Sequence, residues 1–192
     1  MPSKHEYVNM KGRYAGDINP ATKLREGQGA YTYTNTFFQY QGEWNSGIKS
    51  GKGAIVMRDG SYYEGDFVEG EMTGDGERTW DDGSKFVGKF IEGEKHGYGE
   101  MTYGPRTSAK EYRYKGDFNF NVRQGYGELT MRDGTVIKGE FDKNHPEGHA
   151  DILYSNGDTF KGNVNKGVIN GLGEIQYIDG SAYKGNFVNG VK

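Results

Sequence analysis

The sequence predicts an all-β protein: a single-layer antiparallel sheet of repeated β-hairpins that forms an elongated, twisted ribbon. Three observations indicate this fold. An aromatic-x-Gly-x-aromatic pattern returns at a nearly constant interval, a Gly-x-Gly pattern follows it nine residues later, and Asp-Gly or Asn-Gly dipeptides close the units. A helical period of apolar residues does not persist for more than a few positions, because glycine recurs too often for stable helices.

The first pattern places a glycine between two large apolar side chains, and its central glycines are evenly spaced. From Gly42 to Gly185 they follow one another at intervals of 23, 23, 28, 23, 23 and 23 residues, and a weaker copy surrounds Gly16. The predicted repeat core consists of Tyr40, Gly42, Trp44, Tyr63, Gly65, Phe67, Phe86, Gly88, Phe90, Tyr114, Gly116, Phe118, Gly139, Phe141, Gly162, Gly185 and Phe187. Since side chains alternate between faces along a strand, these residues share one face, where the glycines leave room for neighbouring rings.

The second pattern and the turns complete each unit. An alternating run after each Gly-x-Gly, such as the one after Gly53, predicts a second strand. The turn signals are Asp59-Gly60, Asp82-Gly83, Asp133-Gly134, Asn156-Gly157 and Asp179-Gly180. These dipeptides predict tight hairpin turns in which both residues have positive φ. About fourteen strands at about 4.8 Å spacing predict a ribbon roughly 65–70 Å long.

The repeat divides the chain into a lead-in, residues 1–13, and a repeat domain, residues 14–192. The domain contains a degenerate first unit and seven clear units, the last of which is incomplete and stops at Lys192. The long interval contains an insertion at 104–110 that replaces a turn; it is either a surface loop or a partner-specific contact. The incomplete unit leaves an open strand edge, which favours edge-to-edge self-association as one alternative.

Composition excludes several classes of function. The 192 residues carry a net charge of -3, so no basic field attracts nucleic acid. There is no cysteine for a disulfide or a thiolate metal site. Neither a signal-peptide pattern nor a run of about 18 apolar residues occurs. We therefore expect a location in the cytoplasm or on the cytoskeleton.

No catalytic, metal or cofactor site is predicted. His145 and His149 have a spacing that binds zinc on a helix, but Pro146 and Gly148 prevent that helix, so we expect a solvated turn. The glycines of residues 47–53 lack the strand-to-helix context of a phosphate loop. The acidic residues that recur with the period are expected to form a solvated face.

A single-layer sheet cannot cover both of its faces, so we expect some apolar side chains to remain uncovered on the concave side. The predicted partner-binding groove consists of Ile55, Met57, Trp80, Met101, Tyr103, Leu129, Met131, Tyr154, Ile175 and Tyr177, which recur at matching positions of the second strands. A contiguous apolar strip of this kind is typical of an interaction surface, and an amphipathic helix or segment of a partner would bury it.

The repeat resembles the MORN repeat (membrane occupation and recognition nexus). The resemblance lies in Tyr40-x-Gly42-x-Trp44 and in Lys95-His96-Gly97-Tyr98-Gly99, and in register it extends from about Tyr14 to Gly190. It implies a scaffold like those of cilia, flagella, basal complexes and membrane junctions, some of which grip a partner's helix in a curved sheet. Family members with a lipid kinase or methyltransferase carry it in an additional domain, for which this chain has no room.

We therefore expect a non-catalytic protein-binding scaffold of a cytoskeletal, ciliary or flagellar assembly, with other proteins as partners and no nucleic acid. The alternative is a phosphoinositide or membrane-surface binding module, which the family name suggests. The net charge of -3 disfavours it, because anionic lipid is usually bound by clustered Lys and Arg.

Overall fold

Two kinds of strand alternate along the chain. Strands of mostly seven residues carry the aromatic-x-Gly-x-aromatic pattern, and strands of mostly nine residues carry the Gly-x-Gly pattern. The computed structural model describes residues 3–9, 12–34 and 39–192. The strands are β1 (Ser3–Asn9), β2 (Gly12–Ile18), β3 (Arg25–Tyr33), β4 (Gln39–Asn45), β5 (Ile48–Val56), β6 (Tyr62–Val68), β7 (Glu71–Thr79), β8 (Lys85–Ile91), β9 (Glu94–Thr102), β10 (Glu111–Asn119), β11 (Val122–Met131), β12 (Val136–Asp142), β13 (His145–Leu153), β14 (Thr159–Asn165), β15 (Val168–Gln176) and β16 (Ala182–Phe187). Over these residues the structure contains no helix that could cross a membrane.

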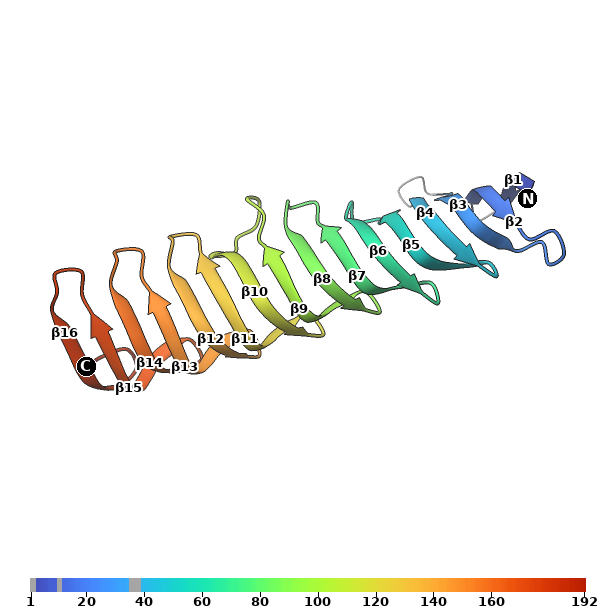
Figure 1. Ribbon diagram of the computed structural model, residues 1–192. Helices are drawn as coiled ribbons and strands as arrows, with labels where there is room; N and C mark the ends of the chain where they lie inside the picture. The colour runs from blue at the N-terminus through green and yellow to red at the C-terminus, as the bar shows by residue number, and fades with distance from the viewer. Residues whose placement is uncertain (1–2, 10–11, 35–38) are drawn as a thin grey trace. The chain divides into compact units, whose positions relative to one another are not determined.

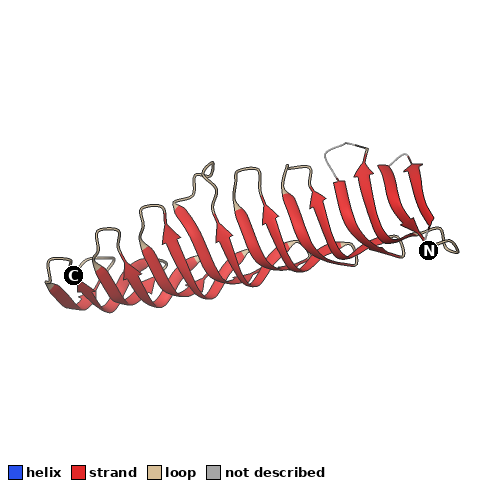
Figure 2. Cartoon of the chain, turned by 45° about the horizontal axis from the view of Figure 1, so that its top comes forward, coloured by secondary structure: helices blue, strands red, loops and turns tan. Residues whose placement is uncertain are grey.

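The chain divides into two units, residues 1–94 (unit 1) and residues 95–192 (unit 2). In unit 1 the strands β1 to β8 lie side by side in chain order, and in unit 2 the strands β9 to β16 do the same (Figure 1). Every neighbouring pair in each unit is antiparallel. Within each unit the described strands form a single layer (Figure 2). The predicted fold class, a single-layer antiparallel hairpin repeat, is confirmed.

The turns correct one expectation. At Asp59-Gly60 only the glycine has positive φ, 79°, and the turn is a longer loop in which Met57 N donates to Ser61 O at 2.8 Å. The two-residue turns with positive φ at both positions lie at the other end of the hairpin, as at Ser46 (50°) and Gly47 (86°). The Asp of this dipeptide instead stabilises the loop: the Asp59 carboxylate accepts hydrogen bonds from Ser61 N and Oγ at 2.9 and 2.5 Å.

The glycines of neighbouring strands face each other, and a ring covers each pair. Gly65 of β6 faces Gly76 of β7, and the Tyr63 ring lies over both. A Cβ on Gly76 would lie 2.5 Å from Tyr63 ring atoms, closer than real Cβ contacts come. The register then shifts by a bulge in the second strand, between Gly65 and Phe67 on the first. This close approach explains why both positions need glycine.

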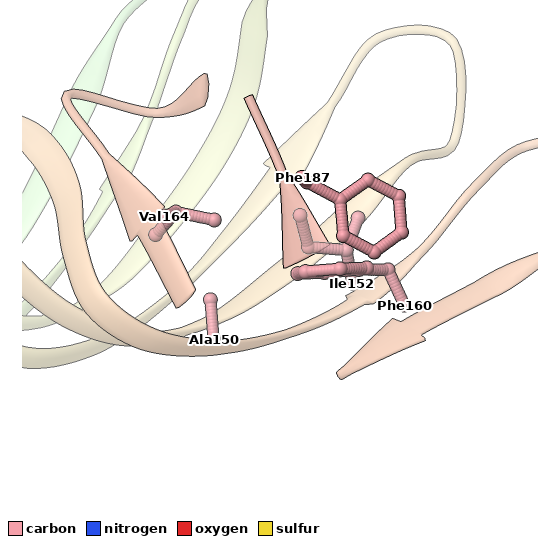
Figure 3. Close-up of a cluster of buried hydrophobic side chains, with 5 residues drawn as sticks. All are labelled: Ala150, Ile152, Phe160, Val164 and Phe187. Carbon is pink, nitrogen blue, oxygen red and sulfur yellow. The ribbon is translucent and has the colours of Figure 1, made fainter. Parts of the chain in front are cut away.

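Apolar side chains pack only against neighbours along the sheet. In unit 2, one such cluster joins Ala150, Ile152, Phe160, Val164 and Phe187, which come from β13, β14 and β16 (Figure 3). Tyr14, in the degenerate first repeat, is also buried, and its hydroxyl donates a hydrogen bond to Asp17 O at 2.8 Å. The strand β1 lies within the stretch assigned to the lead-in and pairs with β2 along its whole length.

Candidate partner-binding face

Each unit has two chemically different faces. The aromatic face carries the repeat-core rings and the central glycines. The polar face carries the residues between them, such as Gln41 and Glu43 on β4. Register places the second-strand residues Ile55 and Gly53 on the aromatic face and Ala54 on the polar face.

The rings of the aromatic face bury one another. Predicted core rings are almost completely buried, with Tyr63 and Phe86 at 0% exposure. They form edge-to-face pairs: the ring centroids of Tyr63 and Phe67 lie 5.4 Å apart, and those of Tyr63 and Phe90 lie 5.1 Å apart. The Tyr63 hydroxyl donates to Asp66 O at 3.0 Å, and burial raises its pKa.

Cationic side chains at the start of the second strands pack against these rings. The sequence analysis did not predict this contact. The Arg25 guanidinium lies 4.2 Å from the Trp44 ring centroid, and Lys49 Nζ lies 5.4 Å from that of Phe67. Arg123 of unit 2 is only 8% exposed and lies 5.5 Å from the Tyr114 ring centroid. The signal in the sequence is a basic residue two positions before the Gly-x-Gly glycine.

The ten residues predicted to form the groove lie on the aromatic face, beside the packed rings. Ile55, Met101 and Leu129 are buried among their neighbours, so they offer a partner little surface. The other seven are partly buried: Met57, Trp80, Tyr103, Met131, Tyr154, Ile175 and Tyr177. That these seven contact a partner stays a prediction.

The hollow of unit 1 lies on the opposite, polar face. It has a volume of about 1010 Å³, and backbone of Gly42, Gly53, Gly65, Gly76 and Gly88 forms part of its lining. The side chains around it include Gln41, Ala54, Tyr62, Glu64, Glu77 and Val87. We call this hollow the polar groove. Two smaller hollows in unit 2, of about 660 and 420 Å³, are lined by residues that include Lys161.

The acidic residues that recur on the polar face have a structural role. Glu43 Oε1 accepts a hydrogen bond from Lys52 N at 3.0 Å, and Asp66 Oδ2 accepts one from Asp75 N at 2.9 Å. Both donors belong to the bulge of the second strand, whose N–H groups the sheet leaves unpaired. Sequence reasoning assigned these carboxylates only to a solvated face.

One line of residues on the polar face differs between the units. It contains the residue before each central glycine and its cross-strand partners, and we call it the middle row. In unit 1 the middle row reads Ala15, Ala30, Gln41, Ala54, Glu64, Glu77 and Val87. In unit 2 it reads Glu100, Lys115, Glu128, Lys138, Asp151, Lys161, Glu174 and Lys184.

The middle row of unit 2 alternates in charge and forms ion pairs. Lys138 Nζ lies 2.9 Å from Glu128 Oε2, and Lys184 Nζ lies 3.1 Å from Glu174 Oε2. The hydrogen bond from Lys138 holds the pKa of Glu128 below its usual value, and the one from Lys184 does the same for Glu174. Lys138, Lys161 and Lys184 are therefore paired with acidic side chains of the sheet rather than offered to an anionic ligand.

The insertion in unit 2 is held by one arginine of the following turn. Arg132 Nη2 donates to Gly104 O at 2.6 Å, and Arg132 Nε donates to Ala109 O at 2.9 Å. Thr107 N closes the loop on itself by donating to Gly104 O at 3.2 Å. The loop is thus an ordered part of the hairpin edge, and both interpretations of its function stay open.

Metal chemistry finds no support in the residues that the structure describes. They contain no group of three or more His, Asp or Glu side chains able to hold a metal ion. His145 and His149 lie on the strand β13, where a turn was expected, and both are exposed. His149 Nε2 lies 3.9 Å from Asp151 Oδ1.

Comparison with known proteins agrees with this architecture. The profile of the MORN repeat matches residues 23–36, 40–62, 63–85, 86–107, 114–136, 138–159 and 160–182. The chain belongs to the MORN repeat family. A closer kinship with MORN repeat-containing protein 1, indicated by residues 37–44, 59–65 and 70–74, stays a prediction; residues 37–38 lie outside the described residues.

Solved structures of other proteins show distant likeness to this MORN chain. The TCP10 domain of Danio rerio CPAP in complex with a STIL peptide is 13% identical, covers 96% of this chain and 84% of its own, and has a TM-score of 0.43. The SAS-4 (dCPAP) TCP domain of Drosophila melanogaster in complex with a proline-rich motif of Ana2 is 12% identical, covers 97% and 95%, and has a TM-score of 0.37. We draw nothing about this chain from likeness at this level.

Proposed function

We propose that this MORN protein is a non-catalytic scaffold of a cytoskeletal or ciliary assembly, and that it holds a segment of a partner protein in the polar groove of unit 1. The observation that carries the proposal is the groove itself, a hollow of about 1010 Å³ floored by glycine backbone and Ala54. Backbone exposed at such a floor lets a partner approach closely, since no side chain stands in the way. The proposed location is the cytoplasm, on the cytoskeleton or in a cilium or flagellum.

A membrane-surface function has less support. Binding to anionic lipid needs Lys and Arg that are free to meet phosphates. The lysines of the middle row in unit 2 face acidic residues on the neighbouring strands. In unit 1 the middle row carries no cation at all over its described residues, from Ala15 to Val87.

The test fills the groove and leaves the rest of the chain unchanged. The immobilised protein is incubated with an extract of ciliated cells, bound proteins are identified, and their affinity is then measured with purified partner. Ala54→Trp places an indole on the groove floor, and Ala182→Trp places the same group on an exposed position of β16 in unit 2.

We expect Ala54→Trp to weaken binding at least about tenfold, which is about 1.4 kcal/mol, and Ala182→Trp to change it less than about twofold. Equal retention of every partner by both variants would refute the groove as the binding site. Partners without any cytoskeletal or ciliary protein among them would refute the proposed assembly while leaving the scaffold.

A further inference from the structure

The middle row of unit 1 contains an arrangement that sheet stability alone does not favour. Glu64 of β6 and Glu77 of β7 face each other directly across the strand pair. Like charges at such positions destabilise an antiparallel sheet, because their Cβ atoms lie only about 4.5–5.5 Å apart. In unit 2 every pair of the middle row, such as Lys138 with Asp151, joins opposite charges.

The neighbours of these two carboxylates leave the polar groove acidic. Glu77 Oε1 lies 2.7 Å from Lys85 Nζ, and Glu64 Oε2 accepts a hydrogen bond from the Tyr62 hydroxyl at 2.8 Å. The groove lining has four acidic side chains, Glu43, Glu64, Asp75 and Glu77, against one Lys. That Lys52 is itself bonded to Asp66 at 2.6 Å.

The acidic imbalance extends over the whole of unit 1. Its sequence contains 15 Asp and Glu against 11 Lys and Arg, whereas unit 2 contains 12 against 13. Complementary charge raises both the rate of association and the selection of a partner. The charges of unit 1 therefore favour a cationic ligand.

Apolar groups stand beside the carboxylates of the groove. Tyr62 is 38% exposed and faces Val56, which is 37% exposed, while Val87 is 46% exposed and faces Glu77. Lys and Arg side chains lay their aliphatic stems along such surface and reach a carboxylate with the charged head. A bare metal ion fits less well, because the described acidic side chains form no cluster that could hold one.

We propose that the polar groove of unit 1 selects an extended, Lys- and Arg-rich segment of the partner protein, with Glu64 and Glu77 as its main contacts. The inference rests on the proposed function and adds the chemistry of the partner. From β4 to β8 the groove crosses four strand spacings of about 4.8 Å, and an extended segment of about six residues covers that length.

The test uses a fluorescein-labelled hexalysine peptide and follows its binding by fluorescence anisotropy. Glu64→Lys reverses one charge in the groove and recreates the Lys–acid pairing that unit 2 already uses, so the variant is expected to fold. Glu140→Lys is the matched control: it also replaces one acid of a facing acidic pair, Glu140 and Glu147, on the polar face of unit 2.

We expect Glu64→Lys to weaken hexalysine binding at least about tenfold and Glu140→Lys less than about twofold, although both change the net charge equally. Equal weakening by both variants, or no binding to the unaltered protein, would overturn the inference. The proposed function has a separate outcome. If Ala54→Trp blocks the natural partner and Glu64→Lys does not, the groove is the binding site but its partner segment is not basic. If neither variant affects the partner, both the proposed function and this inference are refuted.

Discussion

The hairpins β6–β7 of unit 1 and β12–β13 of unit 2 occupy the same place in the repeat and differ on the aromatic face. In β6–β7 the Tyr63 ring lies over two glycines, Gly65 and Gly76. In β12–β13 the ring is replaced by Ile137, and the second glycine by Ala150, which is 1% exposed. The first glycine stays, because a Cβ on Gly139 would lie 2.6 Å from the His149 backbone oxygen; the other two nearest atoms belong to Ala150, at 3.2–3.3 Å. The second glycine is thus required by the ring and not by the strand.

The same two hairpins differ in charge on the polar face. Glu64 faces Glu77 in unit 1, whereas Lys138 faces Asp151 in unit 2. The backbone register is the same in both, so the sheet tolerates either arrangement. The difference shows that the rings of the aromatic face constrain which residues fit, while the middle row of the polar face can change its charges without a change of register.

The largest effect is expected from adding one methyl group under the ring. Gly76→Ala places a Cβ 2.5 Å from Tyr63 ring atoms, so the ring must move and its hydroxyl loses Asp66 O. We expect a loss of about 3 kcal/mol in the free energy of unfolding. The reverse change in unit 2, Ala150→Gly, is expected to cost only about 1 kcal/mol, for one lost methyl and a more flexible backbone. Urea unfolding measures both, and equal losses would contradict the coupling between ring and glycine.

The second prediction is that the two units differ in stability at alkaline pH. Burial raises the pKa of Tyr40 to about 12 and that of Tyr63 further in the same direction. Because the unfolded chain ionises near 10.0, this stability is complete below pH 10 and is lost as the pH rises through the folded-state values. At the equivalent positions, burial raises the pKa of three residues in unit 1, Tyr14, Tyr40 and Tyr63, and of Tyr114 in unit 2, where Ile137 and Phe160 cannot ionise and Tyr183 is only partly buried. We therefore expect unit 1 to unfold at lower pH than unit 2.

Tryptophan fluorescence reports this difference, because the chain has two Trp residues, Trp44 and Trp80, and both lie in unit 1. Its alkaline midpoint should precede the midpoint of the far-ultraviolet circular dichroism signal, which reports both units. Tyr63→Phe should move the fluorescence midpoint to higher pH, and coincident midpoints would speak against the assignment.

The sequence was sufficient for the parts of the fold that depend on period. Evenly spaced glycines between aromatic residues predict the hairpins and their shared face, because register in a sheet follows from alternation. It was insufficient where the result depends on what lies over a side chain. Arg25 and Lys49 lie against the core rings Trp44 and Phe67, a contact that the period does not predict, and the hollow named the polar groove lies on the opposite face. The exchange of Gly for Ala150 becomes intelligible only once the place of the Tyr63 ring is known.

A smaller effect is expected from exchanging the charge patterns of the two middle rows. Glu64→Lys converts the pair with Glu77 to opposite charges and should stabilise unit 1 by about 0.5 kcal/mol. Lys138→Glu makes a like-charged pair with Asp151 in unit 2 and should destabilise it. Urea unfolding at low ionic strength measures both signs, and addition of salt should reduce both effects. A destabilised Glu64→Lys variant would show that the facing acids have a structural role.

The smallest expected effect is a loss of stability at acidic pH. Lys138 holds the pKa of Glu128 below its ordinary value of 4.5, so the stability this pair adds is complete above pH 4.5 and is lost as the pH falls through the lower folded-state value. Since the Lys138 side chain is 52% exposed and that of Glu128 31%, we expect amide protection in β11 and β12 to fall less than about twofold between pH 6 and pH 3. Hydrogen exchange measured by nuclear magnetic resonance detects such a change, after correction for the intrinsic rate. Lys138→Met should abolish it, and an unchanged pH dependence in that variant would assign the acid sensitivity to another pair, such as Lys184 with Glu174.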